Sequence, residues 1–303
     1  MHYPVSFPVA QLQLAALSLQ PLPLTDKPIL CLHGWLDNAA SFIPLAAKLP
    51  DLPILALEFP GHGHSSHRGA DAYYYFFDWV QDLVALCRQQ NWQQLTIVGH
   101  SMGGMVATAL AAAFPELVER LVLIDSLGFI TDVPSNTAKQ LRDGISSRLK
   151  QVSRKPCYSS VAEAAAARQR QSDFGISEAL LLAERGTIQT AAGWTWRADM
   201  RLRHSSVYRL SPTQAEALMR AVQCAVLAVI AEDGMITERA SHAAGRPHGC
   251  GAGHADLRPA RSASVWNGET AGSGLPGTRP HPGLGADRGH GALRRTTGTR
   301  PHR

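Results

Sequence analysis

Short apolar runs alternate with segments of helical periodicity over roughly the first 125 residues. The runs at 28–32, 52–57, 95–98 and 121–124 predict buried strands, because strands covered on both faces are nearly continuously apolar. The intervening apolar spacing predicts helices at about 41–48, 73–89 and 103–114, and residues 7–20 predict one or two short strands. This alternation predicts an α/β core over 1–126, with a mostly parallel sheet and right-handed crossovers.

Residues 127–222 have a different pattern. The segments 160–170 and 177–186 consist of strong helix formers preceded or opened by serines that can cap a helix, and no buried strand is evident. This pattern predicts a helical cap inserted into the core. A strand pattern returns at 225–231, so 223–236 is expected to rejoin the sheet.

Residues 237–303 change again, to a Gly/Arg/Pro-rich composition. They hold half of the chain's 26 glycines and contain no Ile, Met, Phe, Tyr or Lys. Such a segment buries too little apolar surface to offset its ordering entropy, so we expect it to be disordered and the C-terminal part of the fold to be missing or disordered. A GC-rich gene read in the wrong frame gives this same amino-acid composition. A frameshift is therefore our leading hypothesis for the origin of the segment.

The net charge of +5 arises in this tail. Its ten Arg and four Asp or Glu give a net charge of +6, which leaves −1 for residues 1–236. We therefore expect no nucleic-acid partner. A basic tail that binds nucleic acid is the rival hypothesis, but no aromatic residues interleave with its arginines to stack on bases.

The remaining composition favours a cytoplasmic protein. No apolar run reaches the roughly 18 residues of a membrane span, and the first residues lack the basic start of a signal peptide. We therefore expect no membrane association, while the oligomeric state stays open. The odd, widely spaced cysteines suggest neither a metal site nor a disulfide framework; they are Cys31, Cys87, Cys157, Cys224 and Cys250.

A single serine stands between two glycines where the strand at 95–98 is followed by the helix at 103–114. Gly99-His100-Ser101-Met102-Gly103 is the G-x-S-x-G nucleophile elbow, in which a tight turn leaves no room for side chains at Gly99 and Gly103. Ser101 is then a nucleophile at a helix N-terminus, where negative charge is stabilised.

Acyl transfer through Ser101 also needs an oxyanion hole. One donor should be the backbone N–H of Met102, and the second should come from the loop after an earlier strand. The loop after 28–32 makes the N–H of Trp35 the candidate. We interpret His33 in this loop as a structural histidine bonded to the backbone.

Four stretches carry a family resemblance: "LCLHGWLDNAASF" at 30–42, "EFPGHGHSS" at 58–66, "VGHSMGG" at 98–104 and "LLAERGT" at 181–187. They resemble the α/β-hydrolase superfamily and, more closely, the serine hydrolase-like protein family. The resemblance spans about 28–236. It implies an α/β-hydrolase fold with an eight-stranded sheet and a helical lid, no cofactor, and hydrolysis of an ester or related acyl bond of a small molecule.

Two carboxylates compete to orient the general base. Asp233 follows the strand after the cap, which is the commoner position in the superfamily, whereas the family resemblance favours Asp125, toward which we lean. The resemblance also implies a catalytic histidine after a final strand, but none can be matched, so this residue stays unknown. The tail histidines are His242, His248, His254, His281, His290 and His302.

The sequence therefore predicts a serine hydrolase of carboxylic ester type, whose activity is impaired if no histidine supplies the base. The alternative is a catalytically inactive fold that binds a small molecule beneath the cap.

Overall fold

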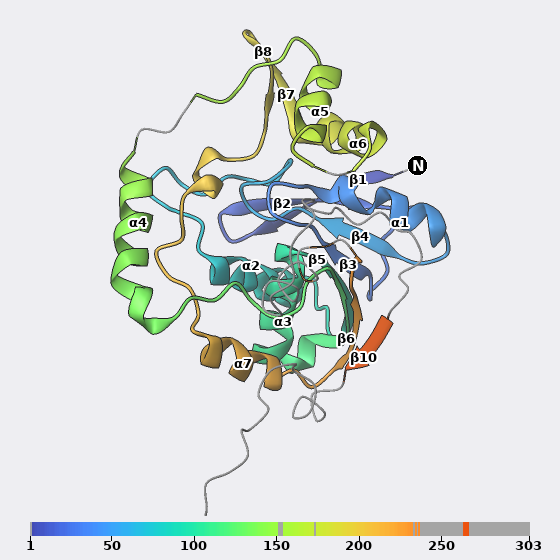
Figure 1. Cartoon of the computed structure of the whole chain (residues 1–303). Coiled ribbons are helices and arrows are strands. Elements are labelled where there is room, and N and C mark those ends of the chain that lie inside the picture. The colour runs from blue at the N-terminus through green and yellow to red at the C-terminus, as the bar shows by residue number, and fades with distance from the viewer. Residues whose placement is uncertain are drawn as a thin grey trace, which may run out of the picture.

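The computed structural model describes residues 2–150, 154–172, 174–232, 234 and 236, together with the backbone of 263–266. Its centre is a sheet with strand order β1-β2-β4-β3-β5-β6-β9-β10 (Figure 1). The strands are β1 (Tyr3–Val9), β2 (Leu12–Ser18), β3 (Ile29–Leu32), β4 (Ile54–Leu57), β5 (Leu95–His100), β6 (Val118–Ile124), β9 (Ala225–Val229) and β10 (Ala263–Trp266). The central strands β4, β3, β5, β6 and β9 are parallel, and antiparallel strands flank them. The prediction of an α/β fold with a mostly parallel sheet is confirmed.

One face of the sheet is covered by α2 (Phe76–Gln89), α3 (Met102–Ala113) and α7 (Pro212–Arg220). Helix α3 follows β5 directly and packs against both α2 and α7. The main hydrophobic core lies between this layer and the strands. Helix α7 falls in the segment that the sequence predicted as cap, but it packs against α3 because its buried residue Ala215 faces the core.

The opposite face is covered by η1 (Ala39–Phe42) and α1 (Ile43–Lys48), which pack on the side of β2, β3 and β4. Toward the other edge, β6 and β9 present alternating side chains to this face that stay only partly buried. A short turn of helix, η2 (Pro115–Leu117), connects α3 to β6. No helix of the described residues is long and apolar enough to cross a membrane.

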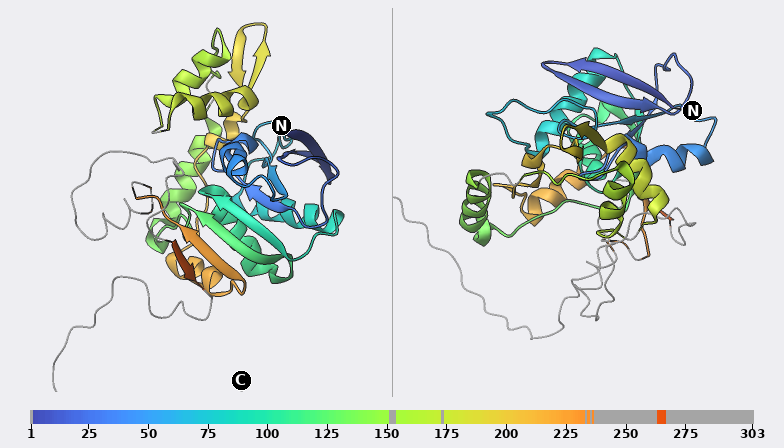
Figure 2. Two further views of the ribbon diagram at one scale, coloured as in Figure 1. Left: turned by 90° about the vertical axis from the view of Figure 1, so that its right-hand side faces the viewer. Right: turned by 90° about the horizontal axis from the view of Figure 1, so that it is seen from above.

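The cap lies between β6 and α7. It contains η3 (Pro134–Asn136), α4 (Thr137–Leu149), α5 (Val161–Gln169), α6 (Ile176–Gly186), β7 (Thr187–Thr190), β8 (Gly193–Trp196) and η4 (Met200–Arg203). Helices α5 and α6 stand above the core with β7 and β8, whereas α4 lies apart at one side (Figures 1 and 2). The antiparallel pair β7–β8 corrects the expectation of a wholly helical cap. Strand β7 is exposed except at Thr187 and β8 is partly buried except at the buried Thr195, so neither has the buried apolar run that marks a core strand.

Strand β10 corrects a second expectation. The sequence analysis found no strand in 237–303, yet Ala263–Trp266 pairs antiparallel with β9 in the register Val265↔Leu227. A four-residue edge strand can form through backbone pairing alone. In a glycine-rich segment, such a short strand leaves no apolar pattern that the sequence could reveal. The expectation of disorder in the rest of 237–303 lies outside the described residues.

Candidate active site

Ser101 occupies the turn between β5 and α3 in a strained conformation. Its backbone angles are φ 47° and ψ −117°, on the positive-φ side that non-glycine residues rarely adopt. The Ser101 N–H donates to the carbonyl of Ile124 at 3.1 Å, and the hydroxyl of Ser126 donates to the Ser101 carbonyl at 2.7 Å. These bonds to and beyond β6 hold the turn in place at the N-terminus of α3.

The two elbow glycines lie where backbone segments touch. A Cβ atom on Gly103 would stand 2.1 Å from the carbonyl oxygen of Leu32, and one on Gly99 would stand 2.5 Å from the Cα of Gly104. Neither approach is possible for a residue with a side chain. The contact at Gly103 also brings the start of α3 against the end of β3, where the predicted oxyanion loop begins.

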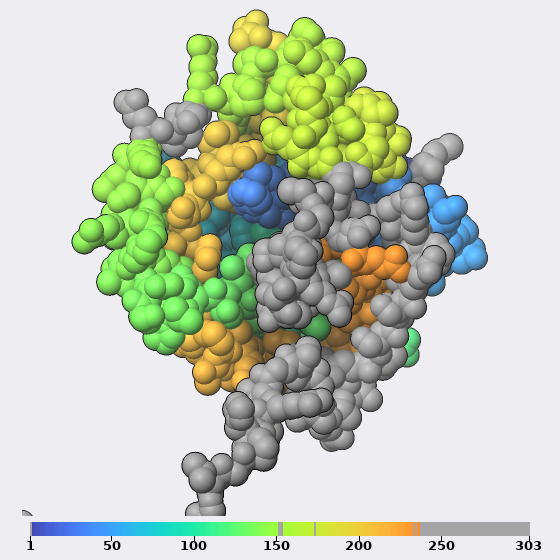
Figure 3. All heavy atoms as spheres, in the orientation of Figure 1, coloured from blue at the N-terminus to red at the C-terminus, as the bar shows by residue number. Residues whose placement is uncertain are grey.

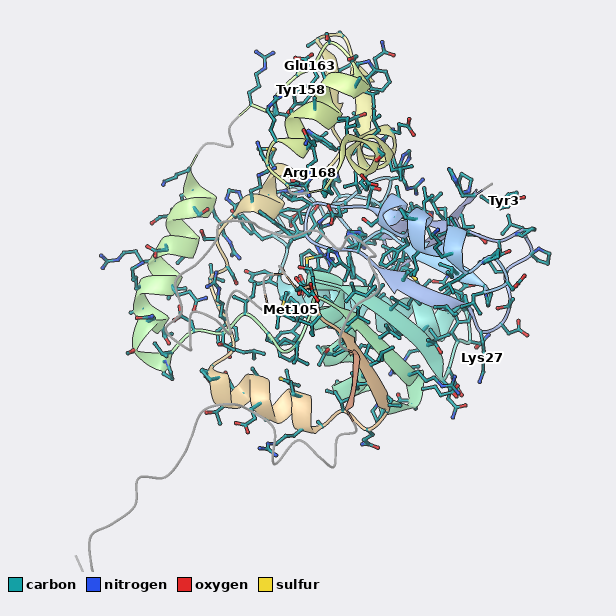
Figure 4. The ribbon with its side chains drawn as sticks, turned by 45° about the vertical axis from the view of Figure 1, so that its right-hand side comes forward. Tyr3, Lys27, Met105, Tyr158, Glu163 and Arg168 are labelled. Carbon is teal, nitrogen blue, oxygen red and sulfur yellow. The ribbon has the colours of Figure 1, made fainter. Side chains whose placement is uncertain are left out.

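Ser101 opens into a small pocket of about 30 Å³. Its polar lining comes from Ser101, Asp125 and Ser126, at the ends of β5 and β6. The rest of the lining is mainly apolar and consists of Met105, Leu127, Gly128, Phe129, Ile130 and Ile236. Figure 4 places Met105 near the centre of the molecule, between the sheet and the cap. The pocket thus combines a few polar groups with an apolar wall, and its volume is far below the roughly 300–1,000 Å³ of typical small-molecule sites.

Asp125 is the candidate acid that the structure brings to this pocket. Its side chain is buried, its φ is 42°, and its N–H donates to the carbonyl of Val229 at 2.8 Å. The other candidate, Asp233, lies outside the described residues. Its neighbour Gly234 packs closely on Asp125, since a Cβ there would stand 2.5 Å from the Asp125 Oδ1 atom.

The predicted oxyanion donors lie on the two segments that meet at Gly103. Trp35 sits in a turn closed by a hydrogen bond from the Asp37 N–H to the Gly34 carbonyl at 3.2 Å, and its indole N–H donates to the carbonyl of Leu202 at 3.1 Å. Within the described part of the chain, no acceptor is recorded for the backbone N–H of Trp35 or of Met102.

The histidines near this loop are fixed by their surroundings. His33 is fully buried, with Nδ1 2.7 Å from the Gly34 carbonyl oxygen and Nε2 accepting from the Phe59 N–H at 3.1 Å. The ring of the fully buried His62 lies 4.9 Å from that of His33. Burial lowers the pKa of His33 and lowers that of His62 well below 6.5, so both are neutral. The tail histidines lie outside the described residues, so the catalytic histidine stays unassigned.

An ion pair that the sequence analysis did not foresee joins the core to the cap. The fully buried carboxylate of Glu58 accepts from Arg185 Nε at 2.6 Å and from its terminal nitrogen at 3.0 Å. It also accepts from the backbone N–H groups of His64, at 2.8 Å, and Ala39, at 3.2 Å. Both charged residues belong to stretches that carry the family resemblance, and only the fold reveals that they meet. A second pair, Arg168 with Asp37 at 3.0 Å, links α5 to the loop after β3, and Figure 4 shows Arg168 on the side of the cap nearest the core.

The fold and this site define a hydrolase-type protein: the chain belongs to the alpha/beta hydrolase fold family, which matches residues 27–186. A serine hydrolase-like protein of Danio rerio is 34% identical over 220 residues, covering 70% of this chain and 67% of that protein. Serine hydrolase-like protein 2 of Homo sapiens is 33% identical over 227 residues, covering 72% of each chain. The resemblance inferred from the sequence is confirmed.

Solved structures agree on the fold. A hypothetical protein of Pseudomonas aeruginosa PAO1 superimposes with a TM-score of 0.74 at 38% identity, covering 83% of this chain and 89% of that one. A thioesterase domain from the curacin biosynthetic pathway has a TM-score of 0.65 at 22% identity, covering 75% and 81%, which shows the shared fold alone.

Proposed function

We propose that this protein is a serine hydrolase that cleaves an ester or related acyl bond of a small molecule, with Ser101 as the nucleophile. The observation that carries the proposal is the strained backbone of Ser101 at the junction of β5 and α3, beside Asp125 in one pocket. Strain of this kind persists where the surrounding structure holds it, and it concentrates at functional sites. The names of the serine hydrolase-like relatives support the same reading.

In this mechanism, the Ser101 hydroxyl attacks the acyl carbon and the carbonyl oxygen becomes an oxyanion. The N–H groups of Met102 and Trp35 donate to that oxyanion, and loss of one such donor typically costs about 3–4 kcal/mol of transition-state stabilisation. The alcohol leaves, and water then releases the acyl group from Ser101. A histidine must accept the serine proton, oriented by Asp125 or, alternatively, by Asp233.

A second candidate is an inactive small-molecule binder. This candidate is favoured because His33 and His62 are fully buried and His33 is hydrogen-bonded to the backbone. Neither ring can therefore act as the base for Ser101. Without a base the serine stays protonated and weakly nucleophilic, while the pocket still binds its ligand.

Labelling with a fluorophosphonate probe and turnover of p-nitrophenyl butyrate separate the two candidates. We expect labelling at Ser101 and measurable turnover, both lost in Ser101→Ala, while the exposed control Ser177→Ala keeps them. If the chain is folded but shows neither labelling nor turnover, the result supports the second candidate, an inactive small-molecule binder. Equal turnover by Ser101→Ala and the unaltered chain would exclude Ser101 as the nucleophile.

A further inference from the structure

An aromatic surface leads outward from the Ser101 pocket. Phe129 lines the pocket, and its ring lies 6.1 Å from that of Phe76 in an edge-to-face arrangement. Phe76 in turn lies 5.2 Å from Phe77, which is 42% exposed, and follows Tyr75, which is 44% exposed. A series of contacting aromatic side chains therefore connects the wall of the Ser101 pocket to the surface. Figure 3 shows the molecule hollowed between α4 and the core on this face.

Arg148 of α4 stands at the outer end of this surface. Its guanidinium carbon lies 4.2 Å from the ring centre of Tyr73 and 4.7 Å from that of Tyr75, and it donates to the Tyr75 hydroxyl at 2.9 Å. These contacts hold the cation against two aromatic faces and fix its direction. The side chain is half-buried, so the guanidinium is positioned and still reachable.

Arg148 differs from four arginines near the junction of core and cap in having no acidic partner. Those arginines each pair with a carboxylate: Arg68 with Asp82, Arg168 with Asp37, Arg185 with Glu58 and Arg201 with Asp199. In the part of the chain that the structure describes, no carboxylate pairs with Arg148, and its buried Nε has no hydrogen-bond acceptor.

The charges around Arg148 add to its positive potential. Lys150, just after α4, is exposed, while Asp143 is engaged by Lys139 at 2.6 Å. Because the Nε atom of Arg148 is buried, the terminal N–H groups that Tyr75 does not engage are the ones that remain for a carboxylate or phosphate.

We propose that Arg148 binds an anionic group, a carboxylate or a phosphate, at the far end of the substrate, whose apolar body lies along Phe129, Phe76 and Tyr75. The substrate class is then an ester with an apolar chain that ends in an anion. The identity of the cleaved bond rests on the proposed function, whereas anion binding by Arg148 does not.

The test measures binding of ligands that require no turnover. Octanoate, octyl phosphate and 1-octanol are titrated by calorimetry into the full chain and into its Arg148→Gln and Arg142→Gln variants. We expect Arg148→Gln to weaken at least one of the two anions by about 10- to 100-fold and to leave 1-octanol unchanged, because a hydrogen-bonded charge pair is lost. Arg142→Gln, on the same helix but exposed, should change none of the three. If only the affinity for octanoate falls, the anionic group of the ligand is a carboxylate. If only the affinity for octyl phosphate falls, it is a phosphate.

Unchanged anion affinity in Arg148→Gln overturns the proposal and leaves Arg148 as a brace between α4 and the segment at 73–77. If Arg148→Gln does not fold, salt dependence in the unaltered chain decides. The affinity for one or both anions should fall between about 50 and 500 mM NaCl while that for 1-octanol does not, since screening weakens only the charged contact. If the affinity for neither anion changes with salt concentration, the proposal of an anion site at Arg148 is refuted. None of these readouts depends on hydrolysis, so failure of the proposed function would be seen separately in the fluorophosphonate and ester assays.

Discussion

At the scale of single residues, Ser101 and Asp125 share an uncommon feature. Both are non-glycine residues at positive φ, and both line the same pocket. Each such conformation costs on the order of 1–3 kcal/mol, which the surrounding structure must supply. Here backbone hydrogen bonds that extend the sheet offset this cost. The Ser101 N–H donates to the Ile124 carbonyl, and the Asp125 N–H donates to the Val229 carbonyl. The sheet itself therefore presents the two side chains to the pocket.

The neutral, buried histidines give the fold an acid-sensitive stability. The pKa values of His33 and His62 are lowered by burial, so the unfolded chain binds more protons as the pH falls below about 6.5. The free energy of unfolding therefore keeps its full value above about pH 6.5. Below that pH it falls by up to about 1.4 kcal/mol per pH unit for each histidine.

We therefore expect the free energy of unfolding, measured by urea titration, to fall between pH 7.5 and 5.5. His62→Gln should flatten this slope, whatever its effect at pH 7.5, whereas the exposed control His2→Gln should not. An identical slope in His62→Gln would show that His62 binds protons equally in the folded and unfolded chain, so that burial does not lower its pKa.

At the scale of elements, the contact between core and cap depends on Glu58 and Arg185. Removing one partner of a buried ion pair leaves an uncompensated charge, typically at a cost of about 3–5 kcal/mol. Arg185→Gln should therefore destabilise the protein by that amount in urea unfolding, because Glu58 is fully buried. The exposed control Arg170→Gln should change little.

The double variant Glu58→Gln/Arg185→Gln provides the sharper comparison. It removes both charges, so it should recover part of the stability that Arg185→Gln loses. If Arg185→Gln costs less than about 1 kcal/mol, the pair does not hold the cap to the core.

The core elements were predictable from the sequence because each carries its own signal. Buried runs such as 28–32 and 95–98 are apolar throughout, and the elbow glycines mark the turn between β5 and α3. Parallel strands end at one edge of a sheet, which brings Ser101 and Asp125 together. The pair β7–β8 was missed because its strands are short and lack a buried apolar run. The contact of Glu58 with Arg185 was missed because it joins residues far apart in the chain.

At the scale of the whole molecule, the two faces of the sheet are unequally covered near β6 and β9. Val226 is 1% exposed beneath the helical layer, while its neighbour Leu227 points to the opposite face and is only partly buried. Leu227 pairs in register with Val122, which is also partly buried. Partly exposed apolar side chains near a sheet edge promote pairing between chains, so we expect aggregation and a broad thermal melt.

Substitutions at these adjacent positions test the difference between the faces. Leu227→Lys should reduce aggregation, measured by light scattering during heating, and should lower the melting temperature only slightly, because a lysine on the open face reaches water. Val226→Lys should cost several kcal/mol, roughly the net stability of a small domain, since it buries an unpaired charge in the main hydrophobic core. If Leu227→Lys instead unfolds the protein as Val226→Lys does, then this face is covered in solution by part of 237–303, and the tail contributes to the fold.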